Sequence, residues 1–213
     1  MRPATREWMD VWTALETEGA RDPDITIAPG GRVFLAYVRD DGAKVVARWW
    51  ETTEAEPEAE LTVAEGTNLR HPSVVAWPDG RLGCWYVADG VQKAKYSADG
   101  GNTWTELTGM LGDDLQYAAV CQFKGLTFAA GYNKGACVVE WSNDNGATKS
   151  AVPGGGNTVT VSSSMADEQQ PAICVLPTGQ VKVLVPETDG MVRGYVSDSG
   201  GIGDFRAAGE FAA

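Results

Sequence analysis

Short apolar runs alternate with polar turns along most of the chain. Runs such as residues 33–37 and 74–77 have the length and the β-branched or aromatic residues of strands, and none is long enough to span a bilayer. Turn signals such as Pro78-Asp79-Gly80 separate the runs. Proline presets φ and glycine accepts a positive φ, so these turns favour hairpins. The pattern predicts an all-β protein built from antiparallel strands.

The strand–turn pattern repeats. Four segments align on a glycine turn, and they are residues 21–37, 70–86, 116–128 and 170–181. An anchor residue stands eight positions before each turn glycine, and the anchors are Pro23, Pro72, Tyr117 and Pro171. Each unit is predicted to be a small antiparallel meander. One meander cannot bury both of its faces, so neighbouring units must stack.

Three units carry a second motif about 25 residues after the anchor. The best copy is Ser97-Ala98-Asp99-Gly100-Gly101-Asn102-Thr103-Trp104. The copy at Ser142 has Lys149 near the place of the tryptophan, and the copy at Ser197 is degraded. An aspartate can accept backbone hydrogen bonds within its own turn, and a glycine supplies a positive φ. The motif is therefore expected to form a structural turn.

This pattern, Ser-x-Asp-x-Gly-x-x-Trp, resembles the Asp-box, or BNR repeat, of sialidase-like β-propellers. The resemblance implies a small β-propeller of about four blades, each a four-stranded antiparallel meander, in which the motif joins the third and fourth strands. The expected blades are residues 21–66, 67–112, 113–166 and 167–213. The residues expected to have a structural role in the motif are Ser97, Asp99, Gly101, Trp104, Ser142, Asp144, Gly146 and Ser197.

Residues 1–20 precede the repeats and allow two interpretations. Trp8, Val11, Trp12 and Leu15 would share one face of a short helix. Alternatively, residues 12–15 resemble the strand expected after Trp104, which would make them a ring-closing strand.

Composition limits the function. The 213 residues include 29 acidic and 17 basic ones, giving a net charge of −12. Such a surface repels phosphate backbones, so no nucleic-acid partner is expected. The N-terminus lacks the apolar stretch of a secretory signal, so we expect cytoplasmic synthesis and no membrane partner. With one histidine and no C-x-x-C motif among four cysteines, neither a metal site nor a cofactor is expected.

The resemblance to sialidases raises the question of an active site. Sialidases hold the substrate carboxylate with three arginines, one of them in an Arg-x-Pro motif, and use a tyrosine nucleophile backed by a glutamate. Arg21 and Arg70 fit the Arg-x-Pro motif, and Arg193 and Tyr195 could complete a catalytic set. The alternative is that the motif is architectural, because Pro171 opens its unit without an arginine.

Three functions follow from these observations. The first is a non-enzymatic structural or binding module of a larger assembly, whose partners would be other proteins and further copies of the chain; in style the chain resembles small Asp-box components of bacteriophage virions. The second is a lectin-like propeller that binds a glycan. The third is a sialidase-like glycoside hydrolase. The sequence favours the first and leaves the other two open.

Overall fold

The computed structural model describes residues 20–39, 42–50, 60–108, 111–151, 157–198 and 204–212. The predicted N-terminal helix or strand lies in residues 1–19, outside the described residues. The described residues form four antiparallel sheets of four strands each, without a helix that could cross a membrane. The protein is therefore an all-β, four-bladed propeller, as the sequence predicted.

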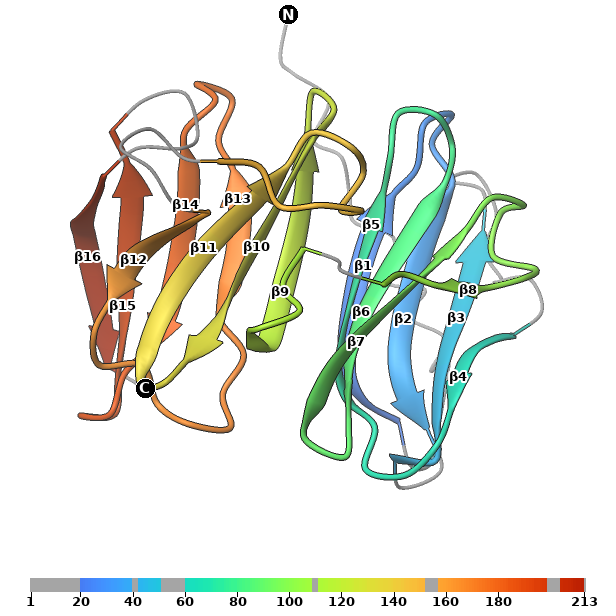
Figure 1. Ribbon diagram of the computed structural model, residues 1–213, viewed down its shortest axis with the longest axis horizontal. Coiled ribbons are helices and arrows are strands. Elements are labelled where there is room, and N and C mark those ends of the chain that lie inside the picture. Colours follow the sequence, from blue (N-terminus) through green and yellow to red (C-terminus); the bar gives the residue numbers. More distant parts are fainter. Residues whose placement is uncertain are drawn as a thin grey trace, which may run out of the picture.

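Each blade is a meander whose strands pair in chain order (Figure 1). Blade 1 holds β1 (Arg21–Ile27), β2 (Val33–Arg39), β3 (Lys44–Trp50) and β4 (Leu61–Glu65). Blade 2 holds β5 (Arg70–Ala76), β6 (Leu82–Ala88), β7 (Val91–Ser97) and β8 (Thr105–Glu106). Blade 3 holds β9 (Gln116–Phe123), β10 (Leu126–Asn133), β11 (Ala136–Ser142) and β12 (Thr158–Ser162). Blade 4 holds β13 (Ala172–Val175), β14 (Val181–Pro186), β15 (Met191–Ser197) and β16 (Phe205–Ala212).

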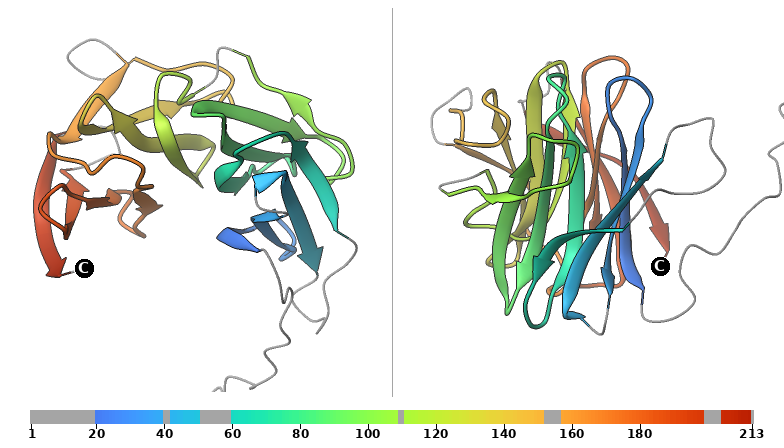
Figure 2. Two further views of the ribbon diagram at one scale, coloured as in Figure 1. Left: turned by 90° about the horizontal axis from the view of Figure 1, so that it is seen from below. Right: turned by 90° about the vertical axis from the view of Figure 1, so that its right-hand side faces the viewer.

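The blades stand side by side along an arc, with blades 1 and 4 at its two ends (Figure 2). The first strand of each blade lies innermost: β1 contacts β5, β5 contacts β9, and β9 contacts β13. These four inner strands line one cavity of about 300 Å³ along the axis. The turns that follow the inner strands therefore gather at one end of the axis, and the starts of the inner strands gather at the other.

Apolar side chains fill each of the three boundaries between consecutive blades. Val38 and Val45 of blade 1 share a cluster with Val74 and Cys84 of blade 2. Trp77 and Trp85 of blade 2 are 1% and 0% exposed and pack with residues of blade 3. Phe128 of blade 3 packs with three valines of β14. Burial of such side chains contributes most of the stabilisation, because each blade alone would leave one face in water.

Polar side chains hold the inner strands of blades 1, 2 and 3 together. Oδ2 of Asp24 accepts hydrogen bonds from the Oγ of Ser73 at 2.9 Å and from the amide of Val74 at 2.7 Å. The same Ser73 Oγ accepts from the amide of Val120 at 3.0 Å. The inner strands belong to separate sheets and have no backbone ladder between them, so side chains satisfy these buried groups.

The turns after β7 and β11 have the same hydrogen-bonding pattern. In the first, the Ser97 Oγ accepts from the amide of Gly101 at 2.7 Å and donates to Asp99 at 2.8 Å. Asp99 in turn accepts from the amide of Thr103 at 2.9 Å. The second turn repeats these contacts with Ser142, Asp144, Gly146 and Thr148.

Other parts of the predicted motif behave differently. Ser197 is buried, and its Oγ accepts from the amide of Val181 at 3.0 Å, while residues 199–203 lie outside the described part. Trp104 packs against the apolar clusters between blades 1 and 2.

Substitution of Gly146 tests how tightly the second turn packs against blade 2. Gly146 has a φ of +78°, and an added Cβ would lie 2.8 Å from the Trp85 ring. Gly135 is the matched control, because its φ is +90° and an added Cβ would have no neighbour within 4 Å. We expect Gly135→Ala to cost about 1 kcal/mol from backbone strain alone. Gly146→Ala should cost about 2–4 kcal/mol, since overpacking adds to the strain.

Urea unfolding followed by tryptophan fluorescence measures both free energies of unfolding. Equal losses in the two variants would show that Trp85 gives way easily, and would contradict tight packing at this boundary.

Candidate functional site

Three inner strands begin with the same strained backbone geometry. Asp22, His71 and Tyr117 have φ values of 52°, 48° and 57°, a region that residues other than glycine rarely adopt. The pairing of each strand with its neighbour shifts register near these residues, as in a β-bulge. A bulge re-aims a side chain relative to a regular strand. The same distortion therefore recurs in blades 1, 2 and 3.

The three strained residues contact one another across blade boundaries. Nδ1 of His71 lies 3.9 Å from Oδ2 of Asp22, and the amide of His71 donates to that oxygen at 3.1 Å. The rings of His71 and Tyr117 meet edge to face with centroids 5.3 Å apart. Tyr132 extends the aromatic contact, with its centroid 6.3 Å from that of Tyr117.

Blade 4 supplies Gln170 to the same place. Its Nε2 donates to the carbonyl of His71 at 3.3 Å and to the carbonyl of Ala118 at 3.1 Å. All four blades thus contribute to one group at the end of the axis where the inner strands begin. We call Asp22, His71, Tyr117 and Gln170 the axial cluster.

Charges around the axial cluster are mixed. Burial lowers the pKa of His71 below its ordinary value, a shift that the Asp22 carboxylate opposes and the Arg70 guanidinium reinforces. Burial also raises the pKa of Tyr117, and the carboxylates of Asp167 and Glu168 add to that shift. At neutral pH the cluster therefore offers an uncharged imidazole and a phenol hydroxyl between carboxylates and guanidinium groups.

Arg21 and Arg70, two members of the sialidase-like set, lie near the axial cluster. The charges of both lower the pKa of His71. The Arg21 guanidinium also lies over the turn between β2 and β3, where an added Cβ on Gly42 would be 2.7 Å from its Nη2.

Arg193 and Tyr195, the other two members, meet at the boundary of blades 3 and 4. Both donate to the carboxylate of Glu187, with Tyr195 at 2.6 Å, and Ser162 of β12 donates to it as well at 2.6 Å. Burial alone would raise the pKa of Glu187, but these hydrogen bonds hold it below its usual range. Among the described residues, no contact joins this pair to Arg21 or Arg70.

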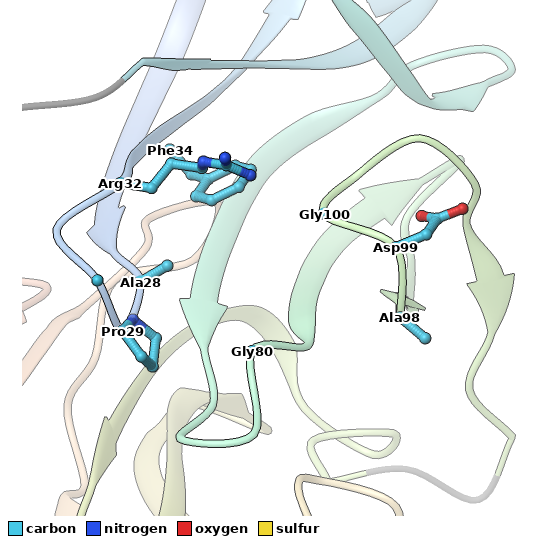
Figure 3. A pocket seen from close by; sticks show the side chains of 9 residues that line it. Ala28, Pro29, Arg32, Phe34, Gly80, Ala98, Asp99 and Gly100 are labelled. Carbon is cyan, nitrogen blue, oxygen red and sulfur yellow. The ribbon is translucent and has the colours of Figure 1, made fainter.

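A second recess lies at the opposite end of the boundary between blades 1 and 2. It measures about 450 Å³ and is lined by three turns, with Arg32 and Phe34 on one side and Ala98–Gly100 on the other (Figure 3). Arg32 stacks on the Trp49 ring at 3.9 Å, and the carboxylate of Asp99 points away from Arg32. This recess offers one guanidinium and mostly backbone, so the axial cluster is chemically the richer site.

Sequence reasoning singled out Arg21 and Arg70 but missed the cluster beside them. Tyr117 was aligned with Pro23 and Pro72, whereas its backbone matches Asp22 and His71, one position earlier. The signal that could have found the cluster is the residue before each proline, since these positions carry Asp22, His71 and Gln170. No three His, Cys, Asp or Glu side chains in the described ranges are grouped to hold a metal ion.

No protein-family model and no curated protein sequence matches this chain. Solved structures do match it. A Hadza microbial sialidase, Hz136, matches with a TM-score of 0.64 at 9% identity, over 89% of this chain and 46% of its own. The NanB sialidase from Streptococcus pneumoniae matches with a TM-score of 0.65 at 9% identity, over 92% and 52%.

A lectin matches equally well. The SapL1 lectin, solved in complex with alpha methyl fucoside, has a TM-score of 0.65 at 12% identity, over 92% of this chain and 67% of its own. The chain spans about half the length of the sialidases that it matches. It therefore shares its fold with propeller sialidases and lectins, and the low identity carries the comparison no further than the fold.

Lys149, which stands near the place of the tryptophan in the second motif copy, binds three carboxylates. Its Nζ lies 3.0 Å from Glu140 and 2.6 Å from Asp113, and it also contacts Asp114. Glu140 is fully buried, and its other oxygen accepts from the amide of Gly112 at 2.8 Å. Burial raises the pKa of Glu140 to about 7, so one of the three carboxylates is partly protonated near neutrality.

The raised pKa of Glu140 predicts a pH-dependent stability. The folded state prefers the protonated form, so this stabilisation is complete below the unfolded pKa near 4.5 and is lost as the pH rises through about 7. Between pH 5 and 8 the free energy of unfolding should fall by up to about 3 kcal/mol through this group. Glu140→Gln should flatten that decline, whereas the exposed-site control Glu106→Gln should leave it unchanged. Urea titrations at each pH measure the free energy of unfolding. An equal decline with pH in the wild-type protein and both variants would refute the assignment of the decline to Glu140.

Proposed function

We propose that this propeller binds a glycan at the axial cluster without hydrolysing it. The observation that carries the proposal is the recurrence of one strained bulge in three blades, which groups Asp22, His71 and Tyr117. Non-glycine residues in the left-handed region cost free energy, and such strain concentrates at ligand sites. Three blades repeat the strain, and the fourth adds Gln170 to the same cluster. A cause confined to a single turn would not explain this grouping.

The chemistry of the cluster suits a sugar. Sugar hydroxyls both donate and accept, so they can pair with the Asp22 carboxylate, the uncharged His71 imidazole and the Tyr117 hydroxyl. The rings of Tyr117 and Tyr132 offer apolar surface for the C–H face of a pyranose. Fold-sharing with sialidases and with a lectin that binds alpha methyl fucoside supports this class of ligand.

Hydrolysis is the second candidate, favoured by one observation. The carboxylates of Asp22 and Glu168 come from different blades and both raise the pKa of His71. Glycosidases use two carboxylates on either side of the scissile bond. The set Arg21, Arg70, Arg193 and Tyr195 is a weaker basis. Tyr195 does donate to Glu187, as the sialidase pattern expects, but no contact among the described residues joins Arg193 and Tyr195 to Arg21 or Arg70.

A role within a larger assembly, such as a bacteriophage virion, stays a prediction from the sequence. Glycan binding is compatible with that role, since a module on an assembly can attach it to a glycan-coated surface.

A glycan array with sialylated and fucosylated oligosaccharides tests binding, and calorimetry with the best probe gives the Kd. His71→Asn removes the imidazole while keeping a residue that tolerates a positive φ. We expect this variant to weaken binding by about tenfold, the effect of losing one or two hydrogen bonds. The matched control is Lys124→Asn, because Lys124 has a φ of 50° but lies in the turn at the opposite end of β9.

Absence of any probe binding by the wild-type protein would refute the proposal. Equal loss in both variants would point to backbone effects rather than recognition. Release of free sugar from the bound probe, abolished by Glu168→Gln, would establish the hydrolase instead.

A further inference from the structure

Each inner strand has one side that faces the preceding blade. In blade 2 that side carries Val74, which is buried with Val38 and Val45 of blade 1. In blade 3 the equivalent Val120 is buried with Trp77 and Val75 of blade 2. In blade 4 the equivalent Ile173 packs against the cluster that holds Phe128 of blade 3. The position is therefore apolar and covered in blades 2, 3 and 4.

Blade 1 has the same apolar side, but no described residue covers it. Ile25 occupies the position of Val74, counted from the shared bulge, and is 59% exposed. Ile27, two residues further on the same side, is 65% exposed. These two and Val91 are the large apolar side chains that stand out as exposed in the described part of the chain. Isoleucines that are this exposed on an edge strand favour association with another apolar surface.

Within the part of the chain that the structure describes, blade 4 has no neighbour on its other side. The side of an inner strand that faces the following blade carries Ser73 and Val75 in blade 2, and both are buried there. Ala172 and Cys174 are the equivalents in blade 4, and both are exposed. No apolar cluster of the described residues contains side chains from both blade 1 and blade 4. The two blades stand at opposite ends of the arc (Figure 2).

We propose that a second copy of this chain covers both sides, with blade 4 of each copy packed on the Ile25 side of blade 1 of the other. The two exposed sides are the halves of a boundary that the chain already forms three times within itself. Ile25 would pack against Cys174 of the partner copy as Val120 packs against Val75 within the chain. The surface is thus complementary to the same chain, and no other partner is needed to explain its chemistry.

The symmetry of such a pair follows from the two sides. Each side is complementary to the other and not to itself, so one contact alone would leave two sides free. A two-fold arrangement of two copies makes the contact twice and leaves no side exposed, which closes the assembly. This inference does not depend on glycan binding.

Light scattering after size-exclusion chromatography tests the pair. The chain has a mass of 22.6 kDa, and we expect the wild-type protein at twice that value. Ile25→Asp places a charge in the proposed contact and should restore the mass of one chain. Val91→Asp is the matched control, because Val91 is 58% exposed but lies on β7 of blade 2, on neither of the two exposed sides. It should keep the mass of two chains.

Cross-linking identifies the contact. Ile25→Cys together with the native Cys174 should give a covalent dimer with a short bismaleimide, and Ile25→Cys in a Cys174→Ser background should not. A single-chain mass for the wild-type protein would overturn the proposal, and a cross-link within one chain would show that the ring closes on itself. A ladder of higher masses, or a dimer that survives Ile25→Asp, would also overturn it.

Discussion

The fold depends on how the inner strands are joined. Consecutive blades share no backbone ladder, so their innermost strands meet only through side chains. The carboxylate of Asp24 binds Ser73 and Val74, and Ser73 binds Val120, which connects three blades through one chain of hydrogen bonds. Burial raises the pKa of Asp24. A partly buried carboxylate is tolerated there because each hydrogen bond to it satisfies a group that would otherwise be unpaired.

The axial cluster follows from the same constraint. Where the ordered part of each inner strand begins, Asp22, His71 and Tyr117 take a left-handed backbone that shifts the strand register. The shift turns the side chain at the bulge towards its neighbours in adjacent blades. Residues two positions apart along the strand thus differ in role: Ser73 joins the blades, while His71 at the bulge belongs to the axial cluster.

Packing at the blade boundaries also explains why blades 1 and 4 each have one exposed side. The boundaries inside the chain combine apolar side chains, as at Trp77 and Trp85, with a few buried hydrogen bonds, such as that from the Trp85 Nε1 to the carbonyl of Leu111 at 2.7 Å. The sides of blade 1 and blade 4 that have no neighbour among the described residues also carry apolar side chains. Ile25 and Cys174 are therefore exposed because of where their blades stand, and not because of a different local design.

The sequence by itself determined the strands, the turns and the number of blades. Alternation of apolar residues and turns such as Pro78-Asp79-Gly80 act over a few residues, so local chemistry suffices to read them. The sequence predicted only part of the candidate site. It identified Arg21 and Arg70 as candidates, but not the role of His71 and Tyr117. Their contact joins residues 46 positions apart in different blades, and the following proline that marks His71 is missing after Tyr117. Only the tertiary structure decided which side chains meet at the axis, because the packing of whole blades sets those distances.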